Sequence, residues 1–202
     1  MFNHTQLPLR RFISYFPVVT ALLAVQLLAF VLLTLMGGST NPQALLRFGA
    51  LESTLLQAGE WWRLILPLFL HVGLMHLLVN GFMLYLLGPQ LEWLYGRRNF
   101  LLLFFMTGIM GNLVLSWLSD TFFTAGADAS IYGLFGVYLY LFLFRKGAID
   151  PETGTGIFIF VGLNILFNLV FSQSNFIADL GGLASGMMMA GPLLRMRKPK
   201  QR

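Results

Sequence analysis

Six long apolar stretches dominate this sequence of 202 residues. The hydrocarbon core of a bilayer is about 30 Å thick, so a helix needs roughly 20 apolar residues to cross it. Stretches close to this length occupy residues 16–35, 70–87, 100–118, 126–144, 156–171 and 176–194. Glycine and proline punctuate the segments between them, as expected where a chain turns. We therefore predict an all-α membrane protein in which residues 16–195 form one domain of six transmembrane helices.

The overall composition agrees with a membrane protein and excludes several kinds of site. Charged residues make up 10% of the chain and hydrophobic residues 57%, and the mean hydropathy is +0.75. Soluble domains carry about 25% charged residues. The chain contains no cysteine, which excludes disulfides, thiolate metal sites and cysteine nucleophiles. We expect no bound metal and no small-molecule cofactor.

The basic residues are divided unequally between the two sides that the predicted helices define. One side would hold Arg10, Arg11, Arg97, Arg98, Arg145, Lys146, Arg195, Arg197, Lys198, Lys200 and Arg202, and the other only Arg47 and Arg63. Cytoplasmic loops are enriched in lysine and arginine, so we expect cytoplasmic tails at residues 1–15 and 196–202. Because the net charge of +5 gathers at the ends of the spans, its expected partner is anionic lipid rather than nucleic acid.

The first apolar stretch is too long for the core of a signal peptide and lacks a small-residue cleavage site. We therefore expect the mature protein to retain it. With compact loops and no organellar targeting segment, the sequence favours an integral protein of a bacterial inner membrane.

Polar side chains occupy the outer ends of three of the predicted helices. His71, His76 and Asn80 lie in the outer half of the second, and Asp128 and Asp179 lie near the outer ends of the fourth and sixth. His76 and Asn80 are four residues apart and so share a helix face. Polar groups inside spans indicate a functional site, here a shared water-accessible cavity. Alternatively, they bond neighbouring helices, and the carboxylates reach interfacial water.

Small residues on two predicted helices indicate that these helices pack closely. Gly126, Ala129, Gly133 and Gly136 fall on roughly one face of the fourth helix, and Gly182 and Gly186 form a GxxxG pair in the sixth, beside Gly181 and Ser185. Small side chains let helix backbones approach each other in membranes. We expect the fourth and sixth helices to be neighbours.

Six motifs follow one another along most of the chain. They are GEWWRL (59–64), HVGLMHLLVN (71–80), GPQLEWLYGRRNF (88–100), GIMGN (108–112), GADASIYGLFG (126–136) and ADLGGLASG (178–186). In order and spacing they resemble the rhomboid family of intramembrane serine proteases. The resemblance implies the six-helix rhomboid fold, with Trp62 and Arg63 in the first external loop. It also implies that His76 and Asn80 bind the oxyanion, with His71 in the same motif.

Two positions differ from the rhomboid motifs. Aligning IYGLFG puts Asp128 where the family has its serine nucleophile, and aligning LGG puts Asp179 where it has its histidine base. Serine hydrolysis needs a hydroxyl that passes its proton to a neighbouring imidazole, and neither aspartate supplies these groups. Ser130 lies two residues beyond Asp128, about 200° around a helix, so we expect it to pack between helices instead.

We therefore expect a rhomboid-like membrane protein that does not cleave proteins and binds transmembrane segments of client proteins. The alternative is a variant of a rhomboid serine protease, active only when the serine and histidine are present. Two further readings are an aspartyl intramembrane protease and a proton relay, each built on Asp128 and Asp179. Arg63 is expected to hold the external loop through carbonyl groups or Glu60, and Glu92 with Arg97 or Arg98 to hold a cytoplasmic turn.

Overall fold

The computed structural model describes residues 7–145, 147–171 and 176–196 of the chain. All six apolar stretches form helices, namely α2 (Pro17–Leu35), α5 (Gly73–Tyr95), α6 (Arg97–Leu118), α7 (Asp128–Phe144), α8 (Pro151–Phe171) and α9 (Phe176–Arg195). Among the described residues, α2, α5, α6 and α9 are long and apolar enough to cross a membrane, and apolar α7 is shorter at 17 residues. The helical prediction is confirmed, whereas six membrane crossings stay a prediction.

Shorter elements lie before α2 and in the loops. Helix α1 (Leu9–Tyr15) occupies part of the predicted N-terminal tail, while residues 197–202 of the predicted C-terminal tail lie outside the described residues. The segment between α2 and α5 forms α3 (Pro42–Phe48), α4 (Ser53–Gln57) and two 3₁₀ helices, η2 (Trp61–Leu64) and η3 (Leu66–Phe69).

A small two-stranded sheet accompanies the helices. Strand β1 (Leu51–Glu52) pairs antiparallel with β2 (Phe123–Thr124), and Leu51 lies opposite Thr124. Buried backbone N–H and C=O groups need hydrogen-bond partners. Here the long segment before α5 finds them in the connection that leads into α7. This pairing links two distant parts of the chain at the end of the molecule where α7 begins.

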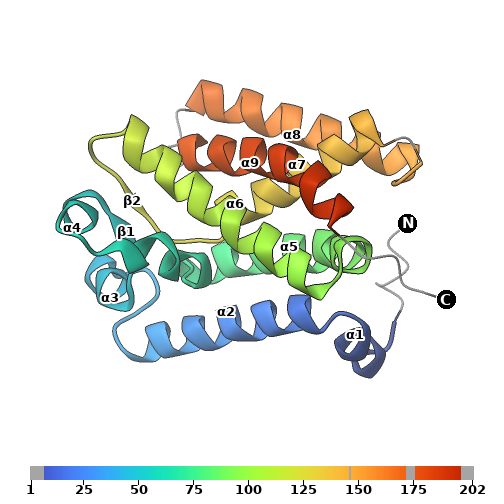
Figure 1. Cartoon of the computed structure of the whole chain (residues 1–202). Coiled ribbons are helices and arrows are strands. Elements are labelled where there is room, and N and C mark those ends of the chain that lie inside the picture. The colour runs from blue at the N-terminus through green and yellow to red at the C-terminus, as the bar shows by residue number, and fades with distance from the viewer. Residues whose placement is uncertain (1–6, 146, 172–175, 197–202) are drawn as a thin grey trace.

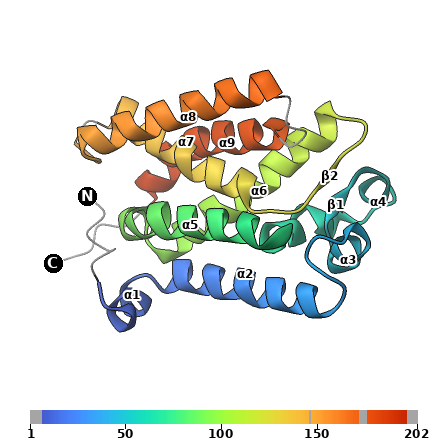
Figure 2. The same cartoon turned by 180° about the vertical axis from the view of Figure 1, so that it is seen from behind.

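The helices are arranged around a central group formed by α6, α7 and α9 (Figure 1). Helix α8 lies beside α7 on one side of this group, and α5 and α2 follow on the other, as the view from behind also shows (Figure 2). Buried apolar side chains such as Leu84, Phe104 and Leu134 form one core between the helices. The central group therefore holds α5 and α7 at fixed positions relative to each other.

Glycines bring α7 and α9 into backbone contact, as the small-residue pattern predicts. A Cβ atom added at Gly182 would collide with the carbonyl oxygen of Ala129, and one at Gly186 would collide with that of Gly133. Gly181 faces α6 instead, where an added Cβ would lie 2.9 Å from the side chain of Val114. The predicted contact between α7 and α9 is confirmed.

Arg63 holds the segment between α2 and α5 in place. Its Nη1 donates hydrogen bonds to the carbonyl oxygens of Leu46 at 2.9 Å and Ala50 at 2.8 Å, and its Nε lies 2.6 Å from Glu60 Oε2. Asn112 of α6 donates to the carbonyl of Leu64 at 2.9 Å. Both roles expected for Arg63 are confirmed. The neighbouring Trp62 side chain is exposed.

Glu92 has two hydrogen-bond partners that the sequence does not predict. Its side chain is 3% exposed, and its two oxygens accept hydrogen bonds from the backbone N–H groups of Val18 (3.1 Å) and Val19 (2.9 Å). The first N–H groups of a helix have no partner inside that helix. Glu92 of α5 therefore caps the N-terminus of α2, and it also interacts electrostatically with Arg97, one of its predicted partners.

Candidate functional site

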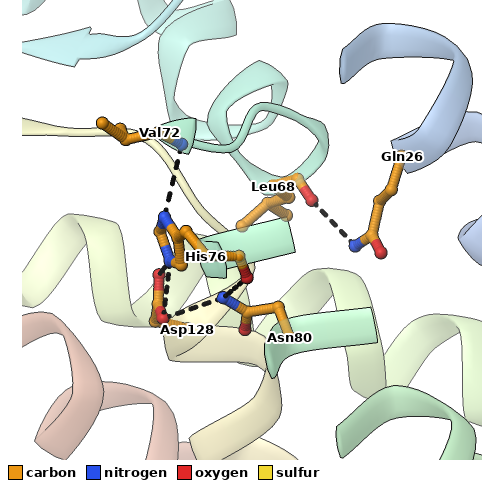
Figure 3. A network of polar contacts seen from close by, with 6 residues as sticks. All are labelled: Gln26, Leu68, Val72, His76, Asn80 and Asp128. Carbon is orange, nitrogen blue, oxygen red and sulfur yellow. Dashed lines mark hydrogen bonds and ion pairs between the residues drawn. The ribbon is translucent and has the colours of Figure 1, made fainter. Parts of the chain in front are cut away.

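The polar side chains of α5 and the first residue of α7 meet directly (Figure 3). The Nε2 atom of His76 lies 2.8 Å from Oδ2 and 3.0 Å from Oδ1 of Asp128. Asn80 Nδ2 donates to Oδ1 of the same carboxylate at 3.1 Å. Two nitrogen donors, one helical turn apart on α5, thus point at one carboxylate.

Local contacts orient the His76 ring. The backbone N–H of Val72 points at His76 Nδ1 at 3.4 Å, so Nδ1 acts as an acceptor there. The Nε2 atom consequently carries the hydrogen that is donated to Asp128. The His76 and Asp128 side chains are 27% and 35% exposed. The pair therefore lies at the edge of the helix group and not sealed within it.

Gly126 makes room for this pair, a role that its place in the small-residue pattern does not predict. A Cβ atom added at Gly126 would collide with the Asp128 carboxylate and would lie 2.6 Å from Cε1 of His76. The backbone N–H of Gly126 donates to the carbonyl of Pro67 at 3.0 Å. The connection into α7 is thus fixed against η3, and the absence of a side chain leaves space for His76. Gly133 lies further along α7, against Thr107 of α6.

His71 lies beside the pair and is fully buried. Its ring stands edge-on to the His76 ring, with the centroids 5.3 Å apart. Among the described residues, neither of its ring nitrogens has a hydrogen-bond partner. His71 therefore contributes to the shape of the site and packs against the ring that binds Asp128.

Asp179 is near the site but is not bonded to Asp128. It lies in the first turn of α9, is 9% exposed, and is close enough to Asp128 for the two to interact electrostatically. Its Oδ1 has no hydrogen-bond partner within the described part of the chain. The hydrogen bonds of Asp128 go to His76 and Asn80 of α5. The structure thus joins three of the five expected site residues by hydrogen bonds.

Ser130 and Gln26 are two further polar residues near the site. Ser130 is fully buried and packs against Gly108 of α6, as expected for a small residue between helices. Gln26 of α2 is 1% exposed and donates to the carbonyl of Leu68 at 3.2 Å, just before His71 (Figure 3). The role of Gln26 was not predicted, although a single amide side chain in an otherwise apolar span indicates such a hydrogen bond.

The chemistry open to this arrangement is anion binding by two fixed donors. A carboxylate at hydrogen-bond distance from an imidazole and an amide is strongly held, because hydrogen bonds to ionised acceptors are stronger than neutral ones. Within the described residues, no cluster of three metal-binding side chains is present. The donors of His76 and Asn80 are thus already occupied by a group of the same chain.

Comparison with known proteins agrees with the motifs and the helical fold. A Rhomboid domain matches residues 58–196, from the segment between α2 and α5 to the end of α9. This chain belongs to the rhomboid family. The rhomboid match includes every residue of the His76 and Asp128 site. With its apolar helices, this family membership makes the chain an integral membrane protein.

Three relatives show how much of this chain aligns with other rhomboid proteins. It is 37% identical to the rhomboid protease GluP of Bacillus subtilis (strain 168), over 85% of this chain and 34% of GluP. It is 36% identical to YdcA of the same organism, over 89% of each chain. It is 33% identical to rhomboid-like protease 2 of Toxoplasma gondii, over 72% of this chain and 52% of that protein. The chain therefore spans about a third of GluP but most of YdcA.

Proposed function

We propose that this rhomboid protein binds transmembrane segments of client proteins and does not cleave them. The motif alignment puts Asp128 at the nucleophile and Asp179 at the general base of a rhomboid serine protease. A carboxylate has no hydroxyl proton to give up and no ring nitrogen to accept one. Loss of such a pair costs orders of magnitude in rate, leaving only what oxyanion binding contributes.

The observation that carries this proposal is the hydrogen bonding of Asp128. In the rhomboid motif, His76 and Asn80 are the residues expected to bind the oxyanion. Here both donate to the Asp128 carboxylate, at 2.8 Å and 3.1 Å. A substrate carbonyl would have to displace an anion from these donors, at the cost of leaving a half-buried carboxylate without partners. The site therefore lacks a nucleophile and has its donors occupied.

A cleavage assay in proteoliposomes tests the loss of proteolysis. It compares the unmodified protein with Asp128→Ser, Asp179→His and the double variant, on a panel of single-span substrates at neutral and mildly acidic pH. We expect cleavage only by the double variant. Cleavage by the unmodified protein would refute the proposal, and an acidic optimum would assign the activity to the two aspartates.

Photocrosslinking tests the binding of client segments. A photoreactive residue is placed in the span of each single-span substrate, and crosslinks to the unmodified protein are mapped by mass spectrometry. We expect crosslinks to helices that border the His76 site, with a scrambled-span substrate as the control. A protein that neither cleaves nor crosslinks to any native span would not be a client-binding protein.

The second candidate function is intramembrane serine proteolysis by a form with both catalytic residues present. It is favoured by the names of GluP and rhomboid-like protease 2, both called proteases, and by the intact pair of donors on α5. Cleavage by the double variant without crosslinking by the unmodified protein would support this candidate. The aspartyl protease and proton relay have no such support, because Asp128 is bonded to α5 and not to Asp179.

The six-span topology with cytoplasmic termini is also a proposal. Because the chain has no cysteine, single cysteines give a clean accessibility test. The test variants are Ser14→Cys in α1, where Ser14 is exposed, and Ser119→Cys after α6, where Ser119 is partly exposed. In intact bacterial cells, we expect an impermeant thiol reagent to label position 119 and to label position 14 only after lysis. Labelling of position 14 before lysis would reverse the proposed orientation.

A further inference from the structure

An apolar groove of about 440 Å³ lies between α2 and α6. Arg97, Leu101 and Phe105 line it from α6, at a spacing of four residues that puts them on one helix face. Val25 lines the facing side from α2, and Phe69 closes one end, with its ring 5.8 Å from that of Phe105. Val25 and Leu101 are 45% and 38% exposed. The groove is therefore open toward the membrane.

The dimensions of the groove suit an extended hydrocarbon chain. From Arg97 to Phe105 the helix rises about 12 Å, at 1.5 Å per residue. The exposed arginine lies at one end of the groove and the paired phenyl rings lie at the other. An apolar groove of this length, open on one side, fits part of an acyl chain lying along α6.

The Arg97 end of the groove differs from the rest of the groove because it carries a charge. Arg97 is the one charged residue among those that line the groove, and its side chain is exposed. Glu92 interacts with it electrostatically, but both Glu92 oxygens accept hydrogen bonds from α2. Within the described part of the chain, the Arg97 guanidinium forms no ion pair within 4.0 Å. An exposed cation at the end of an apolar groove complements the phosphodiester and acyl chain of a phospholipid.

We propose that this groove is a binding site for an anionic phospholipid, with the phosphodiester at Arg97 and one acyl chain between α2 and α6. The proposal does not depend on whether the protein cleaves or binds client proteins. Two other apolar grooves have no basic residue in their lining. The groove beside α8 has Glu152 in its lining, which repels an anionic headgroup, and the groove beneath α1 has no charged residue in its lining.

Native mass spectrometry of the full chain, released from detergent, tests the proposal. The probes are phosphatidylglycerol and phosphatidylcholine with identical acyl chains. A single basic side chain at a membrane surface changes the affinity for an anionic lipid by about fivefold. We expect the unmodified protein to prefer phosphatidylglycerol by at least that factor. Arg97→Gln should remove the preference, whereas Arg98→Gln, which removes an equal charge outside the groove, should retain it.

A second pair of variants tests the acyl-chain part of the groove. Ala21 and Ala24 are both exposed on α2, and Ala21 lines this groove whereas Ala24 lines the groove beneath α1. We expect Ala21→Trp to weaken binding of both lipids and Ala24→Trp to leave it unchanged. Equal binding of the two lipids, or equal effects within either pair of variants, would overturn the proposal. So would an Ala21→Trp variant that loses client crosslinks but keeps its lipid, because the groove would then hold a protein helix.

Discussion

The cap on α2 provides the sharpest prediction about stability. Pro17, at the first position of the helix, has no N–H, and the Thr20 N–H donates to the carbonyl of Phe16. The N–H groups of Val18 and Val19 are therefore the ones that need an external acceptor. Glu92 supplies both acceptors from 73 and 74 residues further along the chain. A change at Glu92 should therefore weaken the contact between α2 and α5.

The magnitude follows from the two hydrogen bonds. Each hydrogen bond to an ionised group contributes about 2 kcal/mol to the free energy of unfolding. Glu92→Gln keeps one carbonyl oxygen but turns an amide N–H toward the second backbone N–H. We expect a loss of about 2 kcal/mol in the free energy of unfolding for Glu92→Gln and about 4 kcal/mol for Glu92→Ala.

Reversible unfolding in mixed detergent micelles, followed by circular dichroism, measures these losses. Glu152→Gln is the matched control because Glu152 is exposed in the first turn of α8, and it should change stability by less than about 0.5 kcal/mol. If Glu92→Gln were no more destabilising than Glu152→Gln, the carboxylate would not be the cap that holds α2. A loss in the alanine variant alone would point to packing instead of hydrogen bonding.

Three further predictions concern α9, the segment between α2 and α5, and β1. Gly182→Val should cost about 3 kcal/mol because its side chain would meet the Ala129 carbonyl, whereas Gly156→Ala, which meets nothing within 4 Å, should be tolerated; thermal melting in detergent compares them. Arg63→Lys should expose the segment before α5 to limited proteolysis, because one ammonium group cannot replace a guanidinium that binds three oxygens; an unchanged cleavage rate would contradict this. Burial would raise the pKa of Glu52, but hydrogen bonds from neighbouring hydroxyl and N–H groups outweigh it and lower the pKa from 4.5 to about 2. Its contribution to stability is thus complete above pH 4.5 and lost as the pH falls toward 2, so Glu52→Gln should flatten the fall in melting temperature over that range.

The positions of the helices and the family could be predicted because their signals are local. The apolar stretch at residues 100–118 predicts α6 (Arg97–Leu118) closely, since the transfer of side chains into lipid depends on each segment's own composition. The second apolar stretch ends at residue 87, whereas α5 continues to Tyr95 through Pro89. Hydropathy reports where the apolar residues end, while backbone hydrogen bonding decides where the helix ends.

The sequence indicates which residues belong to the candidate site, but it does not indicate which of them contact one another. The sequence places His76 and Asn80 on one face, since they are four residues apart on a helix. It does not reveal that the Asp128 carboxylate turns to α5, 52 residues away in sequence from His76, rather than to Asp179. It also does not assign Gly126 the space beside His76. These choices depend on the distance and angle between helices, which a linear pattern does not contain.

The sequence by itself determined that this chain is a helical membrane protein of the rhomboid type, because hydropathy and motif order are properties of consecutive residues. Only the tertiary structure decided which groups satisfy one another: Glu92 with the start of α2, Arg63 with carbonyls of the segment between α2 and α5, and Asp128 with His76 and Asn80. The physical reason is that a buried polar group is stabilised by a hydrogen-bond partner within about 3 Å. The chain supplies several candidates for each group, and helix packing selects among them.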